Sequence, residues 1–350
     1  MTELAPIDLR SDTVTRPDQR MRAAMAAADV ADDVLDRDPT MRALEERVAG
    51  LLGMADALWV PSGSMGNIIA LMAHLRRGDR FLASSHAHVL GNELGTPAWL
   101  AGGLPEALPW DGGPGRSTAG TIRAAAGRTG PYYALRTTLL CLENTHNAAG
   151  GAVTPPDEHC QLVAAAKDCG LVVHLDGARI WNASVALGVP PAALTVGVQT
   201  VQACLSKGLG APVGSVVAGS AEFVVEARRL RKMLGGGVRQ GGVLAAAGLV
   251  ALDQIDDLAA DHENAAALAG GLAELGWQVT TPATNILLAA APDVALAVGQ
   301  LAEIGVLATG MAGQVRFVTH RDVSATDIAE VLRRLKVGSA PTAGASGSGS

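Results

Sequence analysis

Short apolar runs with strand character alternate along this chain with longer segments of helical periodicity, and this alternation constrains the fold more than any other feature. The apolar runs predict strands at 57–60, 80–83, 137–142, 171–175, 200–205 and 214–219. Helical patterns predict helices at 65–77, 157–168 and 221–233. Such alternation is typical of an α/β fold in which crossover helices join the strands of a sheet.

The pattern changes near residue 252. A long Ala/Leu helix is predicted at 261–275, followed by strands at 278–281, 285–290 and 314–320, a helix at 294–303 and a last helix ending near 335. We therefore expect an N-terminal arm at 1–16, a large domain at 17–251, a small α/β domain at 252–336 and a disordered Gly/Ser/Ala-rich tail at 337–350. Thr15 and Pro17 are predicted to be the N-cap and first-turn proline of the first helix.

Composition indicates a soluble protein with a large core. Of the 350 residues, 49% are hydrophobic and 17% are charged. The mean hydropathy is +0.25, but the apolar run 241–252 stops at Asp253 and is too short to span a bilayer. Glu3 and Asp8 argue against a signal peptide. The cysteines form no C-x-x-C pair, so we expect a cytoplasmic location with reduced thiols.

Charge and aromatic content argue against a nucleic-acid partner. The net charge is −7 and aromatic residues make up 3% of the chain, whereas nucleic-acid binding requires a basic surface and often aromatic stacking. The basic run 227–232 is interpreted as a solvated helix face or a subunit contact rather than a polyanion site. The histidines show no metal-ligand spacing, and no metal is expected.

One lysine has an unusual setting. The chain has four lysines, and only Lys207 follows a predicted strand into a glycine-containing bend, "CLSKGLGAPVG". These glycines are interpreted as clearance for a flat cofactor and for a lysine that must move. A dinucleotide loop does not fit, because Gly208, Gly210 and Gly214 are spaced one residue too widely and a strand follows them.

Two further motifs lie at the ends of predicted strands. In "PSGSMGN", Gly63 and Ser64 stand between a strand and a helix, where backbone N–H groups can bind a phosphate, although an N-cap without a ligand explains the motif equally well. In "HLDGARIWNA", Asp176 follows a buried strand at the sheet edge where ligands bind in α/β folds, and Arg179 comes shortly after it.

Together these groups predict a site for pyridoxal 5′-phosphate. Its pyridine nitrogen needs a carboxylate, its aldehyde needs a lysine amine and its phosphate needs N–H donors. Asp176, Lys207 and the loop at Gly63 supply these groups in a consistent order. Taken singly, Asp176 could cap a helix, Arg179 could form a structural ion pair and Lys207 could be an ordinary turn residue.

The chain resembles the L-threonine aldolases of the β-eliminating lyase family, which depend on pyridoxal phosphate. The motifs that carry the resemblance extend in family order from Ile7 to about Leu335: "IDLRSDTVTRP", "DDVLDRDPT", "PSGSMGN", "LENTHN", "HLDGARIWNA", "CLSKGLGAPVGS", "RKMLGGGVRQGGVLAAAG" and "RFVTH". The resemblance implies an aspartate-aminotransferase-like large domain (fold type I) with a mixed, mostly parallel sheet, a small C-terminal domain and a homotetramer built from dimers.

The resemblance also implies roles for residues that bind the cofactor. Lys207 would bind its aldehyde covalently, Asp176 would pair with the pyridine nitrogen and His88 would stack on the ring. The phosphate would be held by Gly63, Ser64 and Ser206. Arg239 would reach a cofactor phosphate in a neighbouring subunit. Without the resemblance, His88 is interpreted as a surface or satisfied core histidine.

The remaining implied roles concern the substrate. Ser11 and Arg316 would grip its carboxylate, and Arg179 would lie near the ring oxygen or that carboxylate. The expected reaction is retro-aldol cleavage of L-threonine, L-allo-threonine and related β-hydroxy-α-amino acids to glycine and an aldehyde, with His88 as the base. Two residues depart from the family pattern, Leu35 where a tyrosine is common and Tyr133 where many members have a second active-site histidine.

Three alternatives remain open from the sequence. Another pyridoxal-phosphate reaction, such as β-elimination or transamination, would use the same cofactor groups. A dinucleotide-dependent oxidoreductase is disfavoured by the strand that follows the glycine bend. A non-catalytic binding protein is disfavoured because the lysine, the aspartate and the arginines occur together.

Overall fold

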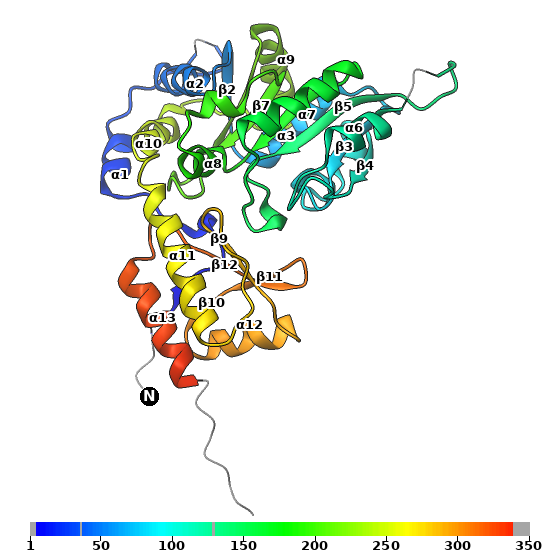
Figure 1. The fold of residues 1–350 in the computed structure, drawn as a ribbon. Coiled ribbons are helices and arrows are strands. Elements are labelled where there is room, and N and C mark those ends of the chain that lie inside the picture. Colours follow the sequence, from blue (N-terminus) through cyan, green and yellow to red (C-terminus); the bar gives the residue numbers. More distant parts are fainter. Residues whose placement is uncertain (1–4, 36, 128–129, 339–350) are drawn as a thin grey trace, which may run out of the picture.

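The computed structural model describes residues 5–35, 37–127 and 130–338 of the chain. They form a larger body around a seven-stranded sheet and a smaller body that contains the last helices (Figure 1). Within the described residues, no helix is both long enough and apolar enough to cross a membrane. The predicted disordered tail begins at 337, but helix α13 continues to Gly338, and residues 339–350 lie outside the described residues.

The large sheet has the strand order β2-β8-β7-β6-β5-β3-β4. Its strands are β2 (Asp56–Val60), β3 (Arg80–Ser84), β4 (Leu104–Leu108), β5 (Thr137–Glu143), β6 (Val172–Gly177), β7 (Thr200–Cys204) and β8 (Ser215–Gly219). Five neighbouring strands, from β7 to β4, run parallel, and only β8 runs antiparallel to both of its neighbours. The predicted α/β class with a mixed, mostly parallel sheet is therefore confirmed. Strand β4 was not predicted.

Helices cover both faces of this sheet, because successive side chains of each strand point to opposite faces. On β2, Leu58 and Val60 pack with α3 (Gly63–His74) and α9 (Ala221–Met233), whereas Ala57 and Trp59 pack into the core on the other face. That second face is covered by α2 (Pro39–Leu51), α7 (Pro156–Asp168), α8 (Ile180–Leu187) and α10 (Gly242–Leu252). The shorter helices are α1 (Gln19–Ala26), α4 (His88–Gly91), α5 (Thr96–Trp99), α6 (Ala119–Ala126), η2 (Asn147–Ala149) and η3 (Pro191–Leu194).

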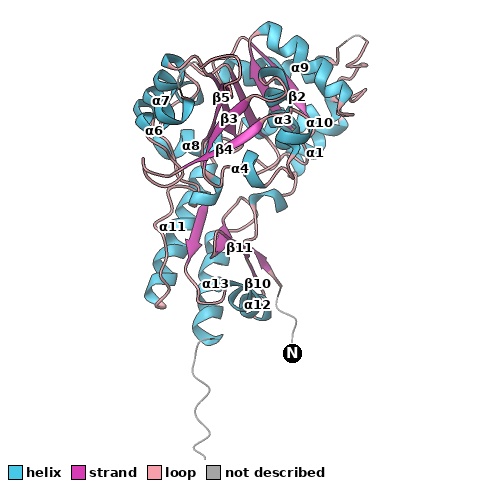
Figure 2. Cartoon of the chain, turned by 90° about the vertical axis from the view of Figure 1, so that its right-hand side faces the viewer, coloured by secondary structure: helices cyan, strands magenta, loops and turns pink. Residues whose placement is uncertain are grey.

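The small body contains the three-stranded sheet β11-β12-β9 and a separate strand pair. Its elements are α11 (Leu258–Glu274), β9 (Ile286–Ala289), α12 (Val294–Glu303), β10 (Val306–Leu307), β11 (Thr309–Met311), β12 (Gln314–Val318) and α13 (Ala325–Gly338). Strand β1 (Ile7–Asp8) pairs in parallel with β10, so the start of the described chain belongs to this body (Figure 2). The short helix η1 (Asp12–Val14) follows β1 and leads toward the large sheet.

Two local predictions are wrong, and a third holds only for part of its segment. The N-cap of α1 is Asp18, whose side chain accepts a hydrogen bond from the Met21 N–H, whereas the Thr15 hydroxyl bonds to the backbone of Asp12 and Lys207. The segment predicted as a strand at 278–281 forms only an isolated bridge at Val279. The basic run 227–232 is not a purely solvated face, because Arg231 is buried against Asp33.

Candidate active site

A pocket of about 220 Å³ lies at the carboxyl ends of β5, β6 and β7, facing the first turn of α3 and reached by η1. Its lining includes Gly63, Ser64, His88, Asp176, Arg179, Ser206 and Lys207, all of which the sequence singles out. Ser11, Arg239 and Arg316 are not among the lining residues. The carboxyl edge of a parallel sheet is where ligands bind in α/β folds, so this pocket is the candidate active site.

Asp176 projects from the end of β6 and is 3% exposed. Its Oδ2 accepts a hydrogen bond from the Asn67 side chain at 2.8 Å, and its Oδ1 accepts one from the Ala178 N–H at 3.0 Å. These two N–H donors fix the orientation of the buried Asp176 side chain at the pocket.

Lys207 follows β7 on a tightly bonded loop. Its carbonyl accepts hydrogen bonds from the Gly210 N–H and from the Thr15 hydroxyl, each at 2.8 Å. A Cβ on Gly210 would lie 2.7 Å from the Arg321 guanidinium, and one on Gly214 would lie 2.4 Å from the Trp59 ring. The interpretation of these glycines as clearance for a cofactor is wrong for both positions, because the glycines admit neighbouring side chains of the protein.

Gly63, at the start of α3, likewise lies against side chains of the protein. A Cβ on Gly63 would lie 2.6 Å from Gln202 Nε2 and 2.8 Å from Cys204 Sγ, so only glycine fits where α3 meets β7. Ser62 caps α3 by accepting a hydrogen bond from the Met65 N–H at 3.2 Å. The first-turn N–H groups of α3 therefore face the pocket, as in helix N-termini that bind phosphate.

His88 begins α4 and is held from two sides. Its backbone N–H donates to Glu143 at 2.7 Å, and its Nδ1 lies 3.0 Å from Glu93 Oε1. Burial alone would lower the pKa of His88, but the hydrogen bond to Glu93 and the charge of Asp176 raise it above its ordinary value. The imidazole is thus oriented by a carboxylate, as in catalytic bases.

Arg179 forms a buried ion pair with Asp12 of η1. Its Nε and one terminal nitrogen donate to the two Asp12 oxygens at 2.7 and 2.6 Å, and its other terminal nitrogen donates to Asn147 Oδ1 at 3.2 Å. Burial would raise the pKa of Asp12, but the charges of Arg179, Lys207 and Arg316 hold it well below its usual range. The structural ion pair considered for Arg179 is present.

Arg316 on β12 is buried near the same place without such a partner. It donates to the Arg10 carbonyl at 3.1 Å and to Asn147 Oδ1 at 2.9 Å, and its Nε is a buried donor with no acceptor in the described part of the chain. Burial and the neighbouring charge of Arg179 lower the pKa of Arg316 to about 10. Asn147 therefore joins the two guanidinium groups. Ser11 accepts hydrogen bonds from the N–H and the hydroxyl of Thr13.

Three other residues singled out by the sequence lie on the surface of this chain. Arg239 pairs with Asp32 at 3.2 Å. The side chains of Leu35 and Tyr133 are 77% and 78% exposed, and the segment that leads into β5 projects from the large body (Figure 1). Neither Leu35 nor Tyr133 lines the pocket of its own chain.

Sequence reasoning missed several residues that line or support the pocket. They are Asp12, Thr13, Asn67, Glu93, Glu143, Asn147 and Gln202. Five of them lie inside the motifs that carry the family resemblance, so the motifs pointed to them although composition did not: Asp12, Thr13, Asn67, Glu143 and Asn147. Glu93 and Gln202 had no comparable signal.

The residues present fit pyridoxal phosphate. A carboxylate, a lysine amine and a helix N-terminus surround one pocket, and Thr145 Oγ1 and Gln202 Oε1 are buried polar atoms of the pocket wall without a partner among the described residues. Oxygen and nitrogen ligands of His88, Glu93 and Asp176 also lie within 4.8 Å of one another. We assign no metal there, because an Asn67 N–H already points at both carboxylates.

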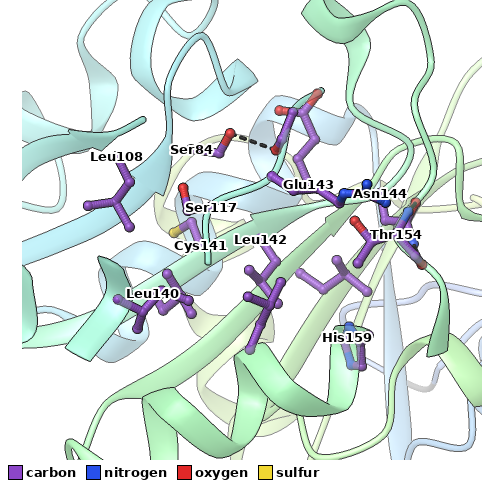
Figure 3. A pocket seen from close by; sticks show the side chains of 15 residues that line it. Ser84, Leu108, Ser117, Leu140, Cys141, Leu142, Glu143, Asn144, Thr154 and His159 are labelled. Atoms are coloured by element: carbon purple, nitrogen blue, oxygen red, sulfur yellow. Dashed lines mark hydrogen bonds between the residues drawn. The ribbon is translucent and has the colours of Figure 1, made fainter. Parts of the chain in front are cut away.

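A second pocket lies on the other side of Glu143, between β5 and α7 (Figure 3). It holds about 20 Å³ and is lined by residues such as Ser84, Cys141 and His159. This is room for about one water molecule. It is too small for a cofactor, and the chemistry belongs to the larger pocket.

Comparison with known proteins identifies the family of this chain. Residues 8–292 match the family model of the beta-eliminating lyases. The chain is 42% identical over 343 residues to the probable low-specificity L-threonine aldolase 2 of Arabidopsis thaliana, covering 95% of this chain and 96% of that one. It is 40% identical over 331 residues to the low specificity L-threonine aldolase of Escherichia coli K12, covering 93% and 97%.

Solved structures share the fold. A Leishmania major threonine aldolase superposes with a TM-score of 0.80 at 20% identity, covering 95% of this chain and 99% of that one. A Sphingomonas wittichii serine palmitoyltransferase superposes with a TM-score of 0.76 at 18% identity, covering 95% and 87%. The resemblance inferred from the motifs is confirmed, and the chain belongs to the beta-eliminating lyase family.

Proposed function

We propose that this lyase uses pyridoxal phosphate to cleave L-threonine, L-allo-threonine and related β-hydroxy-α-amino acids to glycine and an aldehyde. One observation carries the proposal. Asp176 and Lys207, at the carboxyl ends of adjacent strands β6 and β7, line the same pocket as the first turn of α3. The sequence similarity to low-specificity L-threonine aldolases supports this choice of substrate.

Residues of one pocket would hold the cofactor. Lys207 would hold its aldehyde carbon, Asp176 would keep its pyridine nitrogen protonated, and Gly63, Ser64 and Ser206 would bind its phosphate at the start of α3. His88 would lie against the ring. When bound, pyridoxal phosphate supplies an electron sink for the bonding pair released at the substrate α-carbon.

We assign the substrate carboxylate to Arg316 rather than to Arg179. Arg179 already donates to both oxygens of Asp12, so it acts by positioning Asp12 and Asn147. Arg316 has a buried Nε that lacks an acceptor within the described chain, and its positive charge lacks a paired carboxylate there. The substrate carboxylate would supply both the hydrogen-bond acceptor for Nε and the negative charge. Ser11, which lies in the N-terminal arm, would help Arg316 to bind the substrate carboxylate.

His88 would take the proton of the substrate β-hydroxyl. Its Nδ1 faces Glu93, which leaves Nε2 as the nitrogen that receives the proton. Departure of this proton lets the Cα–Cβ bond break with release of the aldehyde, and the same imidazole can return a proton. The raised pKa of His88 strengthens it as a base.

The test is to incubate the cofactor-loaded protein with L-threonine and to measure acetaldehyde and glycine. Lys207→Ala should lower turnover by about 1,000-fold or more, because the covalent attachment is lost. Lys167→Ala, on the exposed end of α7, is the matched control and should keep full activity. Full activity of Lys207→Ala would overturn the proposal. Ammonia and a keto acid as products would instead favour the alternative, a lyase acting by β-elimination.

The assembly and the location are further proposals. We propose a homotetramer built from dimers, located in the cytoplasm, and exposed apolar side chains such as Val34, Leu35 and Met233 support burial against another copy. In such an assembly Arg239 would reach a neighbouring cofactor phosphate, and Leu35 and Tyr133 would affect a neighbouring substrate pocket. Light scattering of the loaded protein should give four times the chain mass of 35.5 kDa. A monomeric mass would contradict it.

A further inference from the structure

A continuous series of hydrogen-bonded polar side chains, buried except for the half-buried His74, lies between α3 and the large sheet, behind the candidate active site. At one end, Nε2 of His74, the last residue of α3, lies 3.1 Å from Oγ1 of Thr200 on β7. The same Thr200 Oγ1 lies 2.9 Å from Nδ1 of His174 on β6. The other ring nitrogen of His174, Nε2, lies 3.0 Å from Oδ1 of Asn67 on α3. Asn67 then contacts both Asp176 and Glu93, each at 2.8 Å. His174 and Thr200 are register partners in the sheet.

With both histidines neutral, the hydrogen atoms of this series of hydrogen bonds can be arranged in only one consistent way. The Asn67 amide must present its NH₂ group to Asp176 and Glu93, because its carbonyl would be repelled by carboxylate oxygens. Asn67 Oδ1 therefore accepts from His174, which must carry its proton on Nε2. His174 Nδ1 is then an acceptor and takes the Thr200 hydroxyl hydrogen. The Thr200 oxygen in turn accepts from His74 Nε2–H.

Burial keeps both histidines in the neutral form that this order requires. It lowers the pKa of His74 to about 4 and that of His174 to about 4. The His74 ring is also stacked on Phe223, with ring centroids 5.7 Å apart. Every link of the chain thus donates toward the two carboxylates of the pocket.

Asn67 connects the two carboxyl groups Asp176 and Glu93 of the candidate active site. Its amide nitrogen donates to Asp176, which faces the pyridine position, and to Glu93, which orients His88. We infer that Asn67 is a positioning residue that holds these two carboxylates in one array, and that His174, Thr200 and His74 fix its orientation from behind. This role rests on the proposed function, because it concerns the orientation of Asp176 and His88.

The first test does not depend on catalysis. In the cofactor-loaded protein labelled with ¹⁵N-histidine, two-bond ¹H–¹⁵N spectra at pH 7 should show His174 and His74 as neutral Nε2–H tautomers. The His174→Gln variant identifies the His174 signals. A Nδ1–H tautomer or an imidazolium at His174 would overturn the proton order. This result is independent of whether the protein cleaves threonine.

The second test separates positioning from mere stability. His174→Leu removes the donor to Asn67 and is expected to lower kcat about 10- to 100-fold with KM for L-threonine nearly unchanged. His174→Gln keeps a side-chain N–H near the Nε2 position and should recover kcat to within about threefold of the wild-type value. The visible absorption band of the bound cofactor should shift in the leucine variant and return in the glutamine variant.

His159→Leu is the matched control. His159 is also a buried histidine of the large body, but it bonds to the Val196 carbonyl, outside this chain of groups. It should lower the thermal midpoint while leaving kcat per folded molecule and the absorption band unchanged. Equal losses of kcat in His159→Leu and His174→Leu would overturn the positioning role. A wild-type protein without aldolase activity, yet with the expected tautomers, would refute the proposed function alone.

Discussion

Two buried arginines lie near one another at the active site, and they differ in what balances their charge. Arg179 forms a two-point ion pair with Asp12, whereas Arg316 forms no ion pair with a carboxylate in the described part of the chain. Both donate to the same oxygen of Asn147. A buried charge without a counter-charge is costly unless a ligand supplies one. From this contrast we expect Arg179 to stabilise the fold, whereas Arg316 is the arginine that we propose for the substrate carboxylate.

The largest expected effect is on stability at the paired arginine. Arg179→Met leaves Asp12 buried without a counter-charge and should lower the free energy of unfolding by about 3–5 kcal/mol. Urea unfolding followed by circular dichroism measures this loss. The double variant Arg179→Met, Asp12→Leu should recover a large part of it, because no charge is left unpaired. An Arg179→Met variant as stable as the wild type would contradict the stabilising role of Arg179.

Replacement of Arg316 should reduce catalytic efficiency rather than stability. Arg316→Met is expected to lower kcat/KM for L-threonine about 100-fold, or about 2.7 kcal/mol at the transition state, through loss of a charge-assisted contact. Its unfolding free energy should stay within about 1 kcal/mol of the wild-type value or rise. Substrate should raise the thermal midpoint of the wild type and not that of this variant. Unchanged kcat/KM would remove Arg316 from the substrate site.

The smallest effect is the pH dependence contributed by Asp12. Its pKa in the folded protein lies below the ordinary value of 3.8. The folded state therefore binds fewer protons than the unfolded state in this range, so the stability from Asp12 is complete above about pH 4 and is lost as the pH falls further. Acid unfolding of Asp12→Asn should be flatter below pH 4 than that of the wild type. If wild type and Asp12→Asn lose stability equally below pH 4, the Asp12–Arg179 ion pair contributes little to the pH dependence of stability.

The sequence predicted the parts of the fold that depend on local pattern. Alternating strand and helix signals were sufficient for the class of the large sheet, and strand ends placed Asp176 and Lys207 at one edge. Strand β4 (Leu104–Leu108) was missed because its sequence "LPEAL" contains a proline and little β-branched character. It lies at the sheet edge, where proline is tolerated.

What the sequence could not supply is long-range pairing. Asp12 and Arg179 are separated by 167 positions, so no periodicity connects them. Glu93 lies in the turn between α4 and α5, and Gln202 lies within strand β7, and neither local sequence marks a functional residue. The glycines after Lys207 were assigned to the cofactor because their real neighbours, Arg321 and Trp59, are distant in sequence.

The pairing of β1 with β10 has a consequence for synthesis. Ile7 is translated long before its partner Val306, and the arm between β1 and α1 carries Asp12 to Arg179 and Thr13 to the pocket. On the ribosome the large sheet can form while the arm is still unanchored. The geometry around Arg179 must therefore await the synthesis of β10, and a nascent chain stalled before β10 should fold its sheet yet lack the finished candidate active site.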